Sequence, residues 1–298
     1  MTALLLGALG LTLSLVLPDI LAGARWTDRA PAAAVVLWQA VTLAAVLCAL
    51  GVVLAAPEEA TRAAGSGKPV VTVALVGALA VAAVIVIRLL VSLAGVSRRS
   101  RARRARHRML ADLLDRAEQH RELEVEGLRV LDGELPLAYC VPGRSPRVVL
   151  SGGALRVLER DQIDAVLAHE QAHLRHRHDV VMESLTAFYR AVPRPLRSRT
   201  PLDAVHLLLE MVADDAARKR CGAEPLRAAL VRLSDAIPLG DVPIDGDRQR
   251  RLDRLARPRP SPAVLTALAG VLATAILVLP TVILVVPWLD RALEAWPL

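Results

Sequence analysis

Four apolar runs constrain this chain more than any other feature of its sequence. They cover residues 3–23, 32–56, 69–96 and 262–288. Each reaches the roughly 17–25 residues that an α-helix needs to cross the hydrocarbon core of a bilayer. The mean hydropathy of +0.42 agrees with this, because soluble domains of this length rarely have a positive average. The sequence therefore predicts a mostly α-helical, multi-pass protein of the cell membrane with four transmembrane helices.

These runs divide the chain into three parts. We expect residues 1–96 to form a three-helix transmembrane region, residues 97–260 one globular domain, and residues 261–298 a fourth transmembrane helix with a short tail. The middle part has ordinary polar content and is long enough for a single domain. No basic segment precedes the first run and no clear small-residue cleavage site follows it, so we expect a retained helix rather than a signal peptide.

Arginine-rich segments flank the globular part on both sides. Residues 97–108 follow the third run, and the arginines between Arg248 and Arg259 precede the fourth. Positive charge next to a span stays in the cytoplasm, so we expect the globular domain to be cytoplasmic and both termini to be external. Arginines could also bind nucleic acid, but beside two spans a topology signal that contacts the lipid bilayer is the simpler interpretation. We therefore expect no direct nucleic-acid partner.

Two histidines four residues apart carry the strongest chemical signal. His169-Glu170-Gln171-Ala172-His173 lies on a predicted helix with Asp161 as its N-cap. Residues four apart share a helix face, so both imidazoles can bind one metal ion. Glu170 lies beside them, where it can act as a general base toward a water molecule. The pattern predicts a catalytic site with one Zn²⁺ per chain, His169 and His173 as ligands and Glu170 as the catalytic residue.

A second predicted helix supplies the third ligand. Thr200-Pro201-Leu202-Asp203 predicts a helix start and Gly222 its end. Glu210 and Asp214 lie four residues apart within an apolar stretch of that helix, where a carboxylate is costly unless it is paired or bound to metal. We assign Glu210 as the third metal ligand and Asp214 as an acceptor that orients a ligand imidazole.

Further polar residues near the motif could also serve the metal. Asp179 occupies the third-ligand position of the longer pattern H-E-x-x-H-x-x-G-x-x-H, but His176 replaces the glycine of that pattern. His178 is expected on the opposite helix face. His206 lies four residues before Glu210 and could line the site, although a surface histidine is the simpler interpretation.

Some features outside the motif also lead to expectations. Asp19 and Arg88 are charges within apolar runs, and we expect either an ion pair between them or an Arg88 side chain that extends to the membrane surface. Residues 192–200 contain prolines and arginines, which fits either a flap over the site or an ordinary connector. The cysteines are too far apart to predict disulfides or a thiolate zinc site; they are Cys48, Cys140 and Cys221.

H-E-x-x-H followed by E-x-x-A-D at Glu210–Asp214 resembles the gluzincin membrane peptidases. These include the HtpX and CAAX-prenyl-protease group and the BlaR/MecR antirepressor group. Residues 136–151 look like the strand before their active-site helix, which can align an extended substrate by β-augmentation. Residues 248–255 look like the R-x-x-R-L-x-R-L stretch before their next span. Three spans, a peptidase domain and a fourth span favour the BlaR/MecR arrangement, which implies an α+β gluzincin domain inserted between helices 3 and 4.

The resemblance implies a zinc metalloendopeptidase that cleaves a cytoplasmic protein in regulated proteolysis. A BlaI/MecI-type winged-helix repressor is the expected substrate. No penicillin-binding sensor follows the last span before Leu298, so a role as a β-lactam receptor is not expected and a separate membrane sensor partner is possible. The competing hypotheses are an HtpX-like quality-control peptidase and a non-catalytic signalling scaffold. Glu170 argues against the scaffold, because structural zinc needs no general base.

Overall fold

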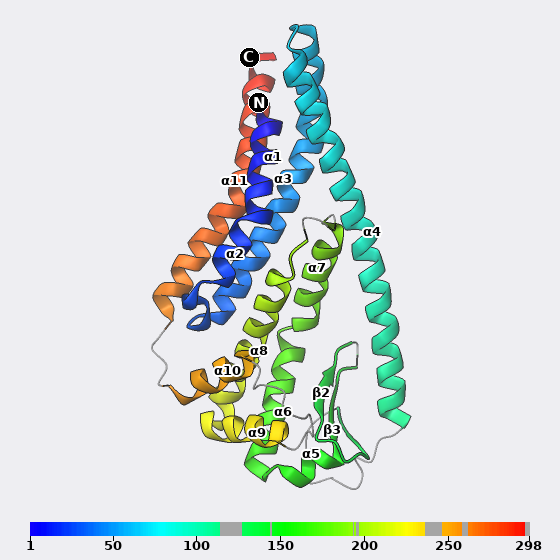
Figure 1. Cartoon of the computed structure of the whole chain (residues 1–298), viewed down its shortest axis with the longest axis vertical. Helices are drawn as coiled ribbons and strands as arrows, with labels where there is room; N and C mark the ends of the chain where they lie inside the picture. Colours follow the sequence, from blue (N-terminus) through cyan, green and yellow to red (C-terminus); the bar gives the residue numbers. More distant parts are fainter. Residues whose placement is uncertain are drawn as a thin grey trace. The chain divides into compact units, whose positions relative to one another are not determined.

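Helices make up most of the computed structural model, which describes residues 1–113, 127–143, 145–192, 194, 197–235, 246–257 and 262–295 (Figure 1). Contacts divide the chain into two units. Unit 1 comprises Met1–Val96, Ser184–Val205 and Ser261–Leu298, and unit 2 comprises Ser97–Glu183 and His206–Pro260. Residues 184–205, which we expected in the globular domain, thus cluster with the apolar helices.

Unit 1 holds the apolar segments. Its elements are α1 (Thr2–Leu15), α2 (Leu17–Ala22), the 3₁₀ turn η1 (Arg25–Asp28), α3 (Pro31–Gly65), α4 (Pro69–Leu113) up to Val96, and α11 (Ala263–Ala295). Four segments are long and apolar enough to cross a membrane, namely Thr2–Ala22, Pro31–Gly65, Pro69–Met109 and Ala263–Asp290. They contain the four runs seen in the sequence, with small differences at the ends. The first is interrupted between α1 and α2, where Pro18 at the start of α2 lacks a backbone N–H for the preceding helix.

Helix α3 packs against both α1 and α11, and Figure 1 shows the three helices side by side. The first turn of α1 and the last turn of α11 lie at the same end of this bundle. Small residues allow α1 and α3 to approach closely: a Cβ atom on Gly51 would lie 2.6 Å from Cδ1 of Leu6, and one on Gly10 would lie 3.0 Å from Cβ of Cys48. Close approach at small residues is the usual basis of helix packing in lipid.

The side chain of Arg88 in α4 binds backbone carbonyl groups within unit 1. Its Nε donates to the carbonyl oxygen of Ala191 at 2.7 Å, and its Nη2 donates to that of Arg190 at 3.2 Å. These residues end α7 (His178–Ala191), where the last carbonyl groups have no donor within the helix. The expected ion pair with Asp19 is therefore wrong, whereas extension of Arg88 to the membrane surface stays a prediction. The unsatisfied helix end accounts for the difference.

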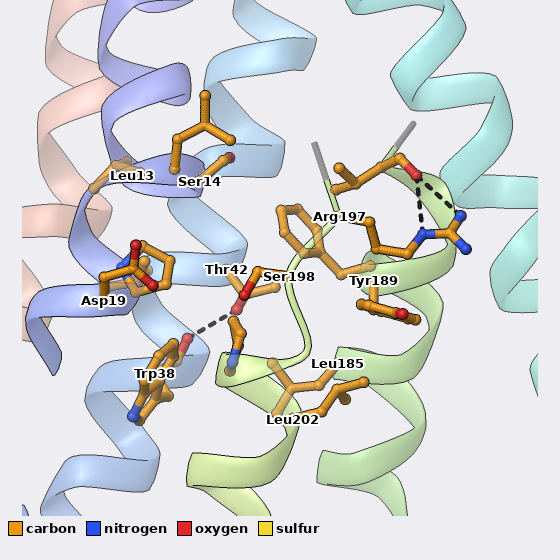
Figure 2. Close-up of a pocket in the computed structure, with 16 residues that line it drawn as sticks. Leu13, Ser14, Asp19, Trp38, Thr42, Leu185, Tyr189, Arg197, Ser198 and Leu202 are labelled. Carbon is orange, nitrogen blue, oxygen red and sulfur yellow. Dashed lines mark hydrogen bonds between the residues drawn. The ribbon is translucent and has the colours of Figure 1, made fainter. Parts of the chain in front are cut away.

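A cavity of about 100 Å³ lies within unit 1 among α1, α2, α3 and residues 185–202 (Figure 2). Val192, Arg197 and Ser198 line it. Nε and Nη2 of Arg197 donate to the carbonyl oxygen of Val192 at 3.3 and 3.0 Å, and both bonds are among the dashed lines in Figure 2. Pro193, Pro195 and Leu196 lie outside the described residues. The described residues of the segment 192–200 thus contact apolar helices, and its role as a flap stays a prediction.

Unit 2 contains a small mixed sheet. Its strands are β1 (Leu128–Leu131), β2 (Ala138–Val141) and β3 (Arg147–Ser151), in the order β1-β3-β2. Strands β1 and β3 are parallel, whereas β2 and β3 are antiparallel. Residues 136–151, expected as one strand, therefore form two strands with a turn between them. Four helices lie wholly in unit 2, namely α5 (Gly152–Val157), α6 (Arg160–Arg175), α9 (Ala223–Asp235) and α10 (Gly246–Ala256). Helix α8 (Thr200–Cys221) belongs to unit 2 from His206 onward.

Helix α6 is buried on two sides. Ile163 and Val166 pack with the sheet residues of β1 and β3, while Ala165 and Ala168 pack with side chains from α8, α9 and α10. The helix starts earlier than predicted: Glu159 is the N-cap and forms a reciprocal capping box with Gln162, so Asp161 is not the cap. A cap of this kind stabilises a helix by about 0.5–2 kcal/mol. Packing on both sides and the capped N-terminus hold α6 in place, and with it the two histidines.

Candidate metal centre

Helices α6 and α8 bring His169, His173 and Glu210 together. One nitrogen from each histidine and one carboxylate oxygen lie within 4.8 Å of one another. The Nε2 atoms of His169 and His173 are 3.1 Å apart. Oε2 of Glu210 lies 3.4 Å from Nε2 of His169, and Oε1 of Glu210 lies 3.4 Å from Nε2 of His173.

These separations fit a zinc site. Zinc binds imidazole nitrogen and carboxylate oxygen at about 2.0–2.2 Å in tetrahedral geometry, which places neighbouring ligand atoms about 3.4 Å apart. The observed distances of 3.1 to 3.4 Å agree with that value. Two imidazoles and one carboxylate leave a fourth position open, as catalytic zinc requires. The donor set and its spacing therefore fit the predicted ion.

Asp214 lies behind the first histidine. Its Oδ1 is 3.1 Å from Nδ1 of His169, and the side chain is completely buried. Burial would lower the pKa of His169, but contact with Asp214 and Glu210 outweighs it and raises the pKa to about 9. Burial would likewise raise the pKa of Asp214, but its hydrogen bonds with Arg251 and its close contact with His169 lower it. Asp214 thus occupies the place expected of a residue that orients the imidazole.

Arg251 of α10 joins the two carboxylates of α8. It donates from Nε to Oδ2 of Asp214 at 2.9 Å and from Nη2 to Oδ1 at 2.7 Å. Its Nη1 lies 2.9 Å from Oε2 of Glu210. Burial would raise the pKa of Glu210, but the contacts with His169 and Arg251 hold it well below its usual range. The sequence did not predict a role for Arg251 at the site. The one feature that pointed to it was its place in the R-x-x-R-L-x-R-L stretch, which resembles that of the gluzincin membrane peptidases.

His178 contacts the second histidine. Its Nδ1 lies 2.8 Å from Nδ1 of His173, and its side chain is buried. The prediction that His178 points to the opposite face is wrong, because α6 ends at Arg175 and Arg177 adopts a left-handed φ of 52° before α7 begins. Because of this break, the number of residues between His173 and His178 no longer predicts the side on which His178 lies. Burial lowers the pKa of His178 to about 3 and that of His173 to about 4, so both imidazoles stay neutral near pH 7.

The other polar residues considered as metal ligands or site residues do not belong to the group of three that can hold a metal ion. Asp179 forms an ion pair with Arg104 of α4 at 3.0 Å. Arg104 also binds Glu183. His176 and His206 are both exposed. The structure therefore favours Glu210 over Asp179 as the third ligand, and it does not place His206 among the buried groups of the site.

Glu170 follows the first ligand on α6 and is partly buried. Burial raises the pKa of its carboxyl group, while His169 opposes the shift. The thiol of Cys140 on β2 lies close enough to this carboxylate for each group to affect the pKa of the other. A carboxylate with a raised pKa, next to metal ligands, is suited to take up and return a proton.

Comparison with known proteins gives an independent view. Residues 99–198, about a third of the chain, match the sequence profile of Peptidase family M48. The chain is 33% identical over 81 residues to "Protease HtpX homolog" of Thermodesulfovibrio yellowstonii, a match covering 26% of this chain and 28% of the relative. It is 33% identical over 78 residues to the protein of that name in Thermoplasma acidophilum, covering 26% of this chain and 24% of the relative. For the Campylobacter concisus homolog the identity is 32% over 81 residues, with 26% and 27% covered.

The chain thus spans about a quarter of the length of these curated relatives. No solved structure matches the chain. The similarities support a metallopeptidase hydrolase related to membrane peptidases of the M48 type. They do not confirm the predicted BlaR/MecR group, and the HtpX-like hypothesis fits at least as well.

Proposed function

We propose that this protein is an integral-membrane, zinc-dependent endopeptidase. The observation that carries the proposal is the spacing of the ligand atoms of His169, His173 and Glu210, which suits one zinc ion, with Glu170 beside them. Zinc at such a site polarises a substrate carbonyl group and lowers the pKa of water. The match to Peptidase family M48 supports peptide bonds as the substrate.

The residues of the site have separate tasks in this proposal. Glu170 takes a proton from the attacking water and passes it to the leaving amine. Asp214 holds His169 in the tautomer that directs Nε2 to the metal, and Arg251 fixes the position of Asp214. His178 does the same for His173: because Nε2 of His173 faces the other ligands, its Nδ1 carries the proton and donates to His178.

The open edge of β2 supplies a place for the substrate backbone. Among the described residues β2 lies at the edge of its sheet. The carbonyl oxygen of Leu137 accepts a hydrogen bond from the backbone N–H of Ser151, so alternate residues from Leu137 bond to β3. The backbone groups of Ala138 and Cys140 therefore point away from β3 and can pair with an extended peptide.

We place the peptidase domain in the cytoplasm because of the arginines that flank it. The HtpX names of the relatives favour a quality-control peptidase that cleaves misfolded protein substrates. Regulated cleavage of a BlaI/MecI-type repressor is the second candidate, because the order of three apolar segments, a globular part and a fourth apolar segment suits it.

The test uses the purified full-length protein in detergent, loaded with zinc, and an unfolded protein such as casein. Glu170→Gln should keep its zinc but cleave about 10²–10⁴-fold more slowly, because it removes the general base. Glu224→Gln is the matched control, since Glu224 is exposed on α9 and contacts Arg227. Equal cleavage by the Glu170→Gln variant and the wild type would refute the proposed catalytic role.

A further inference from the structure

Cys140 is the one cysteine close to the candidate catalytic residue. It pairs with Val148 in the antiparallel ladder of β2 and β3. Side chains alternate along a strand, so Cys140 shares a face with Ala138. Ala138 packs against the core cluster formed by the sheet and α6. The thiol of Cys140 therefore lies on the side of the sheet that faces α6.

On that side lies α6, and Glu170 shares the helix face of Ile163 and Val166, which pack with the sheet, so the thiol and the carboxylate face each other. Each also affects the pKa of the other, as a hydrogen-bonded neighbour would. The Cys140 side chain is half-buried. The other cysteines occupy different surroundings, since Cys48 is buried in α3 and Cys221 lies at the end of α8. All three cysteines belong to the described part of the chain, and only Cys140 contacts the predicted general base.

A cavity of about 240 Å³ within unit 2 lies at this position. Cys140, Val141 and Pro142 line one side, and residues of α4 and α7 line the other. The backbone of Cys140 also faces the open edge of β2, as the pairing of Leu137 with Ser151 shows. A peptide paired with this edge would therefore pass directly beside the thiol and Glu170.

The direction of the hydrogen bond follows from the surroundings of the thiol. Burial raises the pKa of the Cys140 thiol strongly, and the neighbouring Glu170 and Asp179 raise it further. The sulfur therefore keeps its proton and can only donate to the carboxylate. A donor at this point restricts the rotation of the Glu170 side chain, which otherwise has several rotamers.

We propose that Cys140 is a positioning residue, whose S–H group donates a hydrogen bond to Glu170 and holds this carboxylate in its catalytic orientation. The proposal rests on the proposed function, because it assigns Cys140 a task in the reaction of Glu170. It also implies that peptidase activity depends on a free, uncapped thiol. A capped sulfur has no proton to donate.

The kinetic test compares Cys140→Ala, Cys140→Ser and the wild type, all loaded with zinc. Loss of the donor in Cys140→Ala should lower kcat about three- to tenfold with KM unchanged, since a weak thiol donor contributes on the order of one hydrogen bond. Cys140→Ser restores a donor and should recover at least about half of the lost activity on the same reasoning. Cys221→Ala is the control and should match the wild type.

A spectroscopic measurement tests the hydrogen bond without relying on activity. The S–H stretching band of Cys140 can be assigned by infrared difference against Cys140→Ser, and it should shift when Glu170→Gln weakens the acceptor. An unchanged band, or a Cys140→Ala variant with the kcat of the wild type, would overturn the proposal. Absence of any Glu170-dependent cleavage by the wild type, with a band that does shift, would instead contradict the proposed function alone.

Discussion

Arg251 binds Asp214 through two parallel hydrogen bonds, from Nε to Oδ2 at 2.9 Å and from Nη2 to Oδ1 at 2.7 Å. Planar, two-point contacts of this kind are among the strongest between side chains. Asp214 is completely buried, so its negative charge depends on this partner and on His169. The arginine of α10 thus supports His169 of α6, a proposed metal ligand, through a residue of α8.

Removal of this support should destabilise unit 2. Arg251→Met leaves Asp214 as a buried charge without its arginine, which typically costs about 3–5 kcal/mol. We expect a lower midpoint of thermal unfolding and weaker zinc binding. Arg250→Met is the matched control, because Arg250 is exposed one position earlier. Equal unfolding midpoints for the two variants would contradict the role of Arg251.

The metal ligands can be tested by elemental analysis. His169→Ala and Glu210→Ala should each lose most of the bound zinc, because each removes one of three protein ligands. His206→Ala should retain it, since His206 is exposed although it lies on the same helix as Glu210. A full zinc content in purified His169→Ala protein would show that the ion binds elsewhere.

His178 should affect zinc affinity without being a ligand. His178→Ala removes the acceptor for Nδ1–H of His173, and loss of such a supporting contact typically weakens metal binding about 10–100-fold. Competition with a chromogenic chelator measures the change. His206→Ala serves as the control, because His206 is exposed and lies on α8. If both variants bind zinc as the wild type does, His173 needs no orienting partner.

Arg88 should be needed for the stability of unit 1. In Arg88→Leu, the carbonyl group of Ala191 loses its donor, whereas that of Arg190 keeps the bond from Nη2 of Arg197 at 2.9 Å. An unsatisfied polar group in an apolar environment costs several kcal/mol. Unfolding of the detergent-solubilised protein should therefore occur at a lower temperature. Arg88→Lys retains a donor and should lie between Arg88→Leu and the wild type. Identical unfolding of all three would show that the contact has no energetic role.

Reporter fusions can establish the orientation in the membrane. Alkaline phosphatase fused after Leu298 should be active, because we expect this end to be external, whereas green fluorescent protein at the same point should stay dark. A fusion in the loop at Lys68 provides a second external point. Phosphatase activity from a fusion at Asp235 instead, within the globular part, would reverse the proposed topology.

The sequence was informative where one local pattern determines the outcome. Apolar runs of spanning length predicted the long helices of unit 1, and the four-residue spacing of His169 and His173 predicted that their nitrogens meet. A carboxylate within an apolar stretch correctly indicated that Glu210 and Asp214 lie beside them. Helical periodicity and the cost of burying a charge act over short distances, so they can be read from a single segment.

Contacts between distant segments could not be predicted in the same way. Arg251 lies 37 residues after Asp214, and nothing local distinguishes it from its arginine neighbours. His178 was misplaced because a continuous helix was assumed through Arg177, whose left-handed φ breaks it. Residues 192–200 carry arginines and prolines that suit a solvated flap, yet tertiary contacts group the segment Ser184–Val205 with the apolar helices.

The bonds from Arg88 to the end of α7 also have a consequence for biogenesis. The donor precedes its acceptor carbonyls by about a hundred residues, so during synthesis α4 emerges from the ribosome well before α7. Until α7 arrives, the guanidinium group has to be solvated by water or lipid headgroups. The end of α7 therefore provides the partner that replaces this solvation, and chains truncated before Ala191 should be poorly retained by the insertion machinery and degraded early.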